Sequence, residues 1–178
     1  MIPQLETERL FMRGPSADDF EPFASMMADP DVARFIAPAP MERSDAWRAL
    51  SSAIGHWALR GYGAWTVIRK TDGAYLGRVG MINPEGWPGL EIGWTLDKPY
   101  WGKGYATEAA AAAMRYAFLT QPVDRLISNI DPENTPSQSV ALRLGEAKSE
   151  RTSLRIGGKD YPVDIWAITR AAWQARQR

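Results

Sequence analysis

A chain of 178 residues with 45% hydrophobic and 24% charged residues is expected to form one globular domain over residues 1–178, with a core between about residues 7 and 169. Lys plus Arg and Asp plus Glu both number 21, so no excess of charge points to nucleic acid or an anionic membrane as a partner. The absence of cysteine excludes disulfides, thiolate metal sites and a cysteine nucleophile.

The first part of the chain predicts one strand and two helices. Residues 10–13 are typical of a short strand. Ser16 is the expected cap of a helix whose apolar residues recur at helical spacing until Asp29 ends it. Ser44 is the expected cap of a second, longer helix that ends near Gly61.

The middle of the chain predicts three strands. Residues 64–82 are strand-forming and are interrupted by Thr-Asp-Gly at 71–73, which is typical of a hairpin between two antiparallel strands. Residues 90–96 predict a third strand. Gly93 inside this strand indicates either a bulge or the close approach of another backbone or a ligand.

The second half of the chain predicts helices that alternate with strands, followed by a final hairpin. These elements are a helix at 104–119, a strand at 126–130, a helix at 135–144, strands at 148–156 and 161–169 around a turn at 157–160, and a short helix within 170–178. Antiparallel strands combined with one strand–helix–strand crossover predict an α+β fold with a sheet of mixed direction.

Signals for export, membrane insertion and metal binding are missing from the sequence. The N-terminus lacks the apolar run of a signal peptide, and no later stretch is apolar for long enough to span a bilayer. We therefore expect a cytoplasmic protein. With a single histidine, His56, a multi-histidine metal site or a Ser/His/Asp triad would depend on that position alone. We expect no metal, and we predict that His56 is an exposed helix residue.

The loop at 101–106 has two glycines, Gly102 and Gly104, at the start of a predicted helix. Without side chains in the way, its backbone N–H groups can approach an anion, and the helix dipole favours negative charge there. The loop suits a pyrophosphate, with Lys103 either adding a charge-assisted contact or pointing into solvent. The spacing fits neither a Walker loop nor a dinucleotide fingerprint, whose third glycine would fall at Thr107.

Three motifs occur in a characteristic order. They are Thr-Glu-Arg-Leu-Phe-Met-Arg at 7–13, the stretch 90–109 with Ile-Gly-Trp-Thr-Leu and Trp-Gly-Lys-Gly-Tyr-Ala-Thr-Glu-Ala, and Asn-Thr-Pro-Ser at 134–137 with Leu-Gly at 144–145. Over nearly its whole length the chain resembles the GCN5-related N-acetyltransferases, in particular the branch of the ribosomal-protein N-terminal acetyltransferases. The resemblance implies a mixed, mostly antiparallel sheet flanked by helices, with a splayed central pair of strands.

The resemblance also implies acetyl-CoA as cosubstrate. Its pantetheine arm would lie between the strands at 90–96 and 126–130 like a substitute strand. The implied cosubstrate-binding residues are Trp94, Thr95 and Leu96 for the arm, and Trp101, Gly102, Lys103, Gly104, Tyr105, Ala106 and Thr107 for the pyrophosphate. Asn134 either binds the pantetheine amide or starts the following helix.

Two side chains are candidates for proton transfer. By the resemblance, Glu91 is the general base, acting directly or through water; alternatively it is an exposed strand glutamate paired with a nearby Lys or Arg. Ser137 is the implied acid that protonates the departing thiolate, or it bonds locally to helix N–H groups. Many relatives have a tyrosine where this chain has Ala141, and an aromatic residue where it has Glu146.

The predicted function is transfer of an acetyl group from acetyl-CoA to a primary amine by direct attack in a ternary complex. The acceptor is a protein N-terminus or a small-molecule amine, and a second copy of the chain is a further candidate partner, as a homodimer. The alternative is a regulatory domain that binds acyl-CoA but has lost catalysis, which Ala141 favours. Five aromatic residues either line the acceptor pocket or belong to the core: Phe35, Trp47, Trp57, Trp65 and Trp87.

Overall fold

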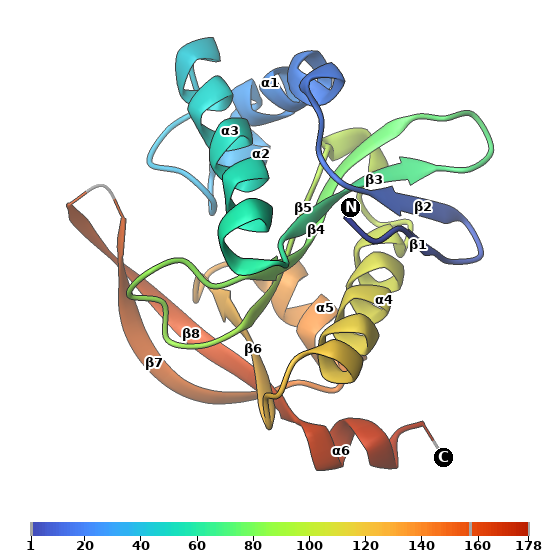
Figure 1. Cartoon of the computed structure of the whole chain (residues 1–178). Helices are drawn as coiled ribbons and strands as arrows, with labels where there is room; N and C mark the ends of the chain where they lie inside the picture. Colours follow the sequence, from blue (N-terminus) through green and yellow to red (C-terminus); the bar gives the residue numbers. More distant parts are fainter. Residues whose placement is uncertain (1, 157, 178) are drawn as a thin grey trace.

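The computed structural model describes residues 2–156 and 158–177, and within them the strands form one eight-stranded sheet (Figure 1). The strands are β1 (Leu5–Glu6), β2 (Leu10–Arg13), β3 (Ala64–Arg69), β4 (Tyr75–Ile82), β5 (Glu91–Leu96), β6 (Arg125–Ile130), β7 (Ala147–Ile156) and β8 (Lys159–Thr169). Their order in space is β1-β2-β3-β4-β5-β6-β8-β7. The described neighbours are antiparallel except β5 and β6, which are parallel.

Helices cover both faces of this sheet. The α-helices are α1 (Phe20–Ala28), α2 (Pro30–Ala33), α3 (Arg43–Arg60), α4 (Tyr105–Thr120), α5 (Thr135–Leu144) and α6 (Arg170–Ala175), with short 3-10 turns at η1 (Ala17–Asp19) and η2 (Lys98–Tyr100). Four alanines of α4 are fully buried in the main core, namely Ala109, Ala110, Ala113 and Ala117. Their short side chains let α4 approach the sheet closely.

A second, smaller apolar cluster joins α1 and α3, which lie together at the top of Figure 1. Phe23 and Met27 of α1 pack there with Leu50 of α3. At the far end of the sheet, the long hairpin of β7 and β8 projects beyond the other strands (Figure 1). The sheet is therefore bordered by helices on one side of β5 and by this hairpin on the other.

The predicted α+β sheet of mixed direction is confirmed, and so is the single crossover, which runs from β5 through α4 to β6. The predicted cap at Ser44 is wrong, because Glu42 immediately precedes α3. Helix α2 was missed: Asp29 ends α1, but its side chain also accepts a hydrogen bond from Asp31 N–H, so α2 begins at once with Pro30. Of the predicted turn at 157–160, Gly157 lies outside the described residues.

Gly93 does not form a bulge. The pairing of β4 with β5 runs without a shift from Gly77–Leu96 to Ile82–Glu91. A Cβ at Gly93 would lie 2.7 Å from Cδ1 of Ile82 and 3.6 Å from Oε1 of Glu91. The missing side chain of Gly93 therefore makes room for the Ile82 side chain beside the Glu91 carboxylate; the approach of a ligand to Gly93 stays a prediction.

The sheet splits between β5 and β6, as expected of the splayed strand pair. Their parallel ladder consists of the single pair Glu91–Ile127, and the Ser128 hydroxyl donates to the Ile92 carbonyl at 2.8 Å. Residues two apart on a strand direct their backbone polar groups to the same side. The N–H and C=O of Trp94 therefore point into the gap, like those of Ile92.

Candidate active site

Two cavities meet at the split in the sheet. The hairpin-side cavity, of about 320 Å³, lies between the loop at 34–38, strands β4 and β5, and the β7–β8 hairpin. The loop-side cavity, of about 1140 Å³, follows the glycine loop and the first turns of α5. Both are lined by Trp94, Thr95, Asn134 and Ser137. A reaction between ligands held in the two cavities would therefore occur beside these side chains.

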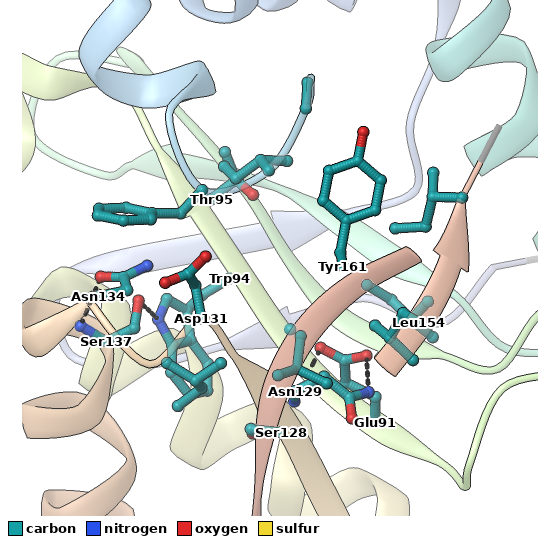
Figure 2. A pocket seen from close by; sticks show the side chains of 18 of the residues that line it. Glu91, Trp94, Thr95, Ser128, Asn129, Asp131, Asn134, Ser137, Leu154 and Tyr161 are labelled. Atoms are coloured by element: carbon teal, nitrogen blue, oxygen red, sulfur yellow. Dashed lines mark hydrogen bonds between the residues drawn. The ribbon is translucent and has the colours of Figure 1, made fainter. Parts of the chain in front are cut away.

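Glu91 lines the hairpin-side cavity and is only 7% exposed. Its carboxylate accepts hydrogen bonds from the Trp87 indole and, at 2.7 Å, from the Asn129 side-chain amide (Figure 2). The backbone N–H of Asn129 approaches the other oxygen at 3.4 Å. The alternative of an exposed glutamate paired with a cation is wrong: in residues 2–156 and 158–177 no Lys or Arg nitrogen lies within 4.0 Å of this carboxylate.

Burial raises the pKa of Glu91, because the carboxylate loses its water, while the hydrogen bonds from Asn129 and Trp87 counteract part of this effect. A carboxylate is a more effective proton acceptor when its pKa moves up toward the working pH. The three donors also fix the orientation of the carboxylate. Glu91 is thus a buried and oriented carboxylate at the edge of the hairpin-side cavity.

Ser137 lies in the first turn of α5. Asn134 caps this helix, its side chain accepting from Ser137 N–H at 3.2 Å, and the Ser137 hydroxyl accepts from the Trp94 indole at 3.2 Å (Figure 2). Because this hydroxyl accepts from Trp94, its own hydrogen is free for another acceptor in the split. Ala141, one turn later, is completely buried near Ile130, so it offers nothing to a ligand.

Glu146 is a second buried carboxyl group near the split. It follows α5 and is 2% exposed, and its Oε1 lies 3.0 Å from the Ser128 hydroxyl oxygen, whereas its other oxygen has no hydrogen-bond partner in the described part of the chain. Burial, together with the nearby charge of Glu91, raises the pKa of Glu146 to about 8. This side chain replaces the aromatic residue of many relatives with a group that is protonated at neutral pH.

Several side chains of the hairpin-side cavity escaped the sequence analysis. Asp131 follows β6, Arg78 comes from β4 and Tyr161 from β8, and no local motif marks any of them. Of the five aromatic candidates, Phe35 and Trp87 line the cavity. The other three do not: Trp47 is half exposed on α3, while Trp57 and Trp65 belong to the main core.

The prediction of an exposed His56 is wrong. Its Nδ1 lies 2.8 Å from the Tyr62 carbonyl oxygen, and its Nε2 accepts from the Asn83 N–H at 3.1 Å. The carbonyl requires a proton on Nδ1, and the N–H requires a lone pair on Nε2. His56 therefore ties the end of α3 to the loop after β4 instead of facing a substrate.

The glycine loop lines the other cavity and offers a row of free donors. Gly102 and Gly104 have φ of +70° and +80°, and the first backbone bond of α4 runs from Glu108 N–H to the Gly104 carbonyl. Within the described residues, none of the N–H groups at 102–107 donates to a protein acceptor. Six consecutive donors at a helix N-terminus suit a pyrophosphate.

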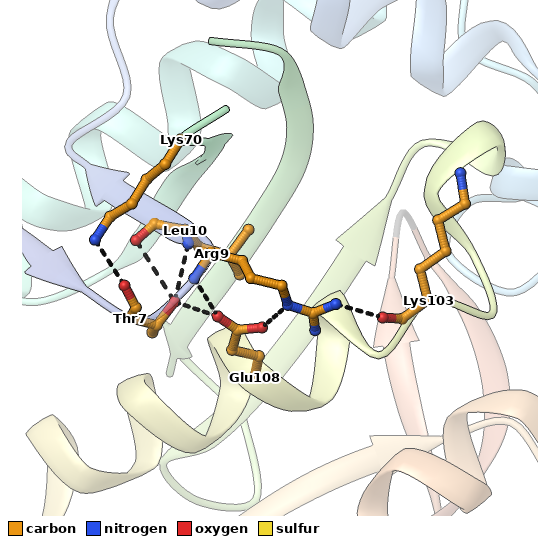
Figure 3. Close-up of polar contacts among 6 residues, drawn as sticks. All are labelled: Thr7, Arg9, Leu10, Lys70, Lys103 and Glu108. Carbon is orange, nitrogen blue, oxygen red and sulfur yellow. Dashed lines mark hydrogen bonds and ion pairs between the residues drawn. The ribbon is translucent and has the colours of Figure 1, made fainter. Parts of the chain in front are cut away.

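The opening motif of the chain holds this loop in place (Figure 3). Glu108, in the first turn of α4, accepts from the Thr7 hydroxyl, from Arg9 N–H at 2.9 Å and from Arg9 Nε at 2.6 Å. The Arg9 guanidinium also donates to the Lys103 carbonyl and lies 4.4 Å from the Tyr105 ring centroid. The motif at 7–13 was recognised in the sequence, but its contact with the glycine loop was seen only in the folded structure. The Lys103 ammonium donates back to the Pro99 carbonyl in this structure.

Known proteins share this architecture. The acetyltransferase (GNAT) domain model matches residues 9–146. The uncharacterized N-acetyltransferase p20 of Bacillus licheniformis is 31% identical over 136 residues, covering 75% of this chain and 76% of that protein. An acetyltransferase structure from Agrobacterium tumefaciens has a TM-score of 0.82 at 28% identity and 96% coverage of both chains. The ribosomal protein uS5-alanine N-acetyltransferase of Escherichia coli is 32% identical over 84 residues, 46% of this chain and 43% of that protein.

The chain therefore belongs to the GNAT acetyltransferase family, and its relatives support acetyl transfer as the general activity. In the described part of the chain, no three His, Asp or Glu side chains are grouped so that they could hold a metal ion. The helices in that part are all too short or too polar to cross a membrane.

Proposed function

We propose that this protein transfers an acetyl group from acetyl-CoA to a primary amine, on a protein N-terminus or a small molecule, by direct attack in a ternary complex. The observation that carries the proposal is the meeting of two cavities at the split in the sheet, one beside free backbone donors and the other beside a buried carboxylate. An anionic cosubstrate and an amine would approach each other from opposite sides. Holding them together lowers the entropic cost of their reaction.

In this proposal the N–H groups at 102–107 bind the pyrophosphate, while backbone groups of Trp94 and Leu96, which face the gap, pair with the pantetheine arm. The backbone groups of Thr95 face β4, so Thr95 would contact the arm through its side chain alone. The amine nitrogen forms a bond to the carbonyl carbon, and the carbon–sulfur bond breaks. Glu91 accepts the proton of the attacking nitrogen, directly or through water, and the Ser137 hydroxyl donates a proton toward the departing sulfur. The products are an amide and free CoA.

The alternative is a domain that binds acyl-CoA without catalysis. Ala141 gives this alternative its basis, since the tyrosine of many relatives is absent. However, Ser137 lies at the junction of both cavities with a hydrogen free to donate, and Glu91 is oriented and desolvated. Both features favour an enzyme over a binding domain.

Release of CoA thiol tests the proposal directly. The chain contains no cysteine, so a thiol reagent reports CoA with no background from the protein. We expect thiol release that depends on both acetyl-CoA and an amine, drawn from a panel of peptides with free N-termini, polyamines and amino acids. Binding of acetyl-CoA without thiol release over the whole panel would favour the binding domain, and no binding of acetyl-CoA would refute the proposed site.

The glycine loop offers a matched pair of variants. Gly102 and Gly73 have φ of +70° and +71°, and a Cβ at either position would meet nothing within 4 Å. Alanine should therefore add the same backbone strain, about 1 kcal/mol, at both. We expect Gly102→Ala to raise the Kd for CoA by roughly tenfold, because the strained turn no longer aligns its N–H groups.

The control, Gly73→Ala, lies in the β3–β4 hairpin and should leave the Kd for CoA unchanged. It should lower the melting temperature by about as much as Gly102→Ala does. Calorimetric titration with CoA measures both affinities. Equal affinities for the two variants would mean that the loop does not bind the pyrophosphate.

A further inference from the structure

Arg78 lines the hairpin-side cavity but has no part in the proposed reaction. It lies on β4, directly across from Thr95 of β5. Its guanidinium carbon is 5.3 Å from the ring centroid of Phe23 on α1, within the range of a cation–π contact. Helix α1 thus supports the side chain of a half-buried cation at the wall of the cavity.

This cation has no anionic partner within residues 2–156 and 158–177. Two other half-buried arginines have carboxylate partners, Arg13 with Asp19 at 2.6 Å and Arg9 with Glu108 at 2.6 Å. Arg170 donates to backbone carbonyls, whereas the Arg78 guanidinium makes no hydrogen bond or ion pair in the part of the chain that the structure describes. Burial lowers the pKa of Arg78 from its usual value, yet arginine remains protonated in proteins. A desolvated charge is costly unless it is paired, so a ligand carboxylate beside Arg78 would neutralise this cation; the carboxyl groups of Glu91 and Asp131 also line the cavity, but neither pairs with Arg78.

The register of β4 and β5 places this cation opposite the proposed base. Side chains alternate along strands, so three successive pairs lie on the face toward the cavity: Arg78–Thr95, Gly80–Gly93 and Ile82–Glu91. The glycine pair contributes no side chain to the floor between the two ends. Arg78 and Ile82 are about 13 Å apart along the strand, a span that suits one small molecule.

We propose that the acceptor is an amine that also carries a carboxylate, and that Arg78 binds the carboxylate while the amine lies over Gly93 next to Glu91. This inference rests on the proposed function. The guanidinium fork matches a carboxylate in two parallel hydrogen bonds. A free amino acid carries both groups in one small molecule, whereas the carboxyl group of a peptide lies far from its N-terminal amine.

Matched acceptors that differ only in this charge test the inference. Each L-amino acid of a panel is compared with its primary amide in the thiol-release assay at one pH, with kcat/KM expressed per concentration of deprotonated amine. We expect the free acid to have a kcat/KM roughly ten- to hundredfold above that of its amide, the range for a charged hydrogen bond. Arg78→Met keeps an apolar contact with Phe23 and should abolish this preference by lowering kcat/KM for the acid alone.

Two controls separate recognition from folding. Arg78→Lys retains the charge and should restore part of the preference, and Arg125→Met, at a half-exposed arginine of β6 outside both cavities, should leave the preference unchanged. The KM for acetyl-CoA should stay the same in all three variants, because Arg78 does not line the loop-side cavity.

The outcomes distinguish this inference from the proposed function. Amides equal to or better than their acids, or an equal loss for both in Arg78→Met, would overturn the role of Arg78. Faster transfer to peptides with a blocked carboxyl group than to any free amino acid would also overturn it, while acetyl transfer to amines would stand. Thiol release with no amine at all would instead contradict the proposed function.

Discussion

Glu91→Gln should lower kcat/KM for the acceptor by about 10²- to 10⁴-fold, the usual contribution of a general base. The amide has the shape of the carboxylate but cannot accept the proton of the attacking amine. The fold should persist, since the glutamine oxygen can still accept from Asn129 or Trp87. Steady-state rates over a series of amine concentrations, together with the melting temperature, check both statements.

The pH profile makes this test specific. Burial raises the pKa of Glu91 above its usual value. On acidification, the wild-type rate should therefore begin to fall at a pH above the pKa of an ordinary glutamate. Glu91→Gln should lose this acidic limb and keep only the titration of the acceptor amine. Ser137→Ala should lower kcat without moving the limb, because serine does not titrate in this range.

A neighbouring glutamate supplies the control for Glu91→Gln. Glu85 belongs to the same loop as Trp87, and its side chain is fully exposed. Glu85→Gln should therefore leave rate and pH profile unchanged. If Glu91→Gln and Glu85→Gln gave the same kcat/KM and the same profile, Glu91 would be removed from the mechanism.

Glu146→Gln should make the protein more stable at alkaline pH relative to the wild type. The pKa of Glu146 is about 8 in the folded state and 4.5 without the fold. Between these values the folded protein holds a proton that the unfolded chain has released, so the free energy of unfolding falls as the pH rises and levels off above about 8. The slope corresponds to roughly 3 kcal/mol between about pH 6 and pH 8.

The glutamine does not titrate, so this slope should vanish in Glu146→Gln. Its amide also replaces an oxygen that has no hydrogen-bond partner among the described residues, which adds an offset that is the same at every pH. Urea unfolding at several pH values separates slope from offset. Glu150→Gln, at an exposed position of β7, serves as the control and should retain the wild-type slope; an equal slope in Glu146→Gln would contradict the buried-proton explanation.

The features predicted well from the sequence are those that depend on local chain geometry. Gly102 and Gly104 indicated a turn at the start of a helix, where both have positive φ, and Asn134 with Pro136 indicated the start of α5, because short-range sterics and capping determine both. The strand at 90–96 was found within one residue of its observed start. The order of the three motifs along the chain then indicated the acetyltransferase family.

The environment of the candidate base could not be predicted, because it depends on distant segments. Glu91 is held by Asn129, 38 residues away, on a strand that meets β5 at a single pair. The local sequence of β5 does not reveal this partner. Arg78 likewise became visible only when the register aligned it with Thr95 across the ladder. In both cases the surroundings of a charged side chain depend on strands that are distant in the sequence.

The split between β5 and β6 leaves two inward-facing strand edges in the middle of the sheet, joined by one ladder pair. Free edges elsewhere invite pairing with other chains. Here two cavities border the edges, and the proposed pantetheine arm would complete the ladder from within. Such a ligand stabilises the native state by mass action, so the cellular supply of coenzyme would set part of the resistance of this protein to unfolding and degradation.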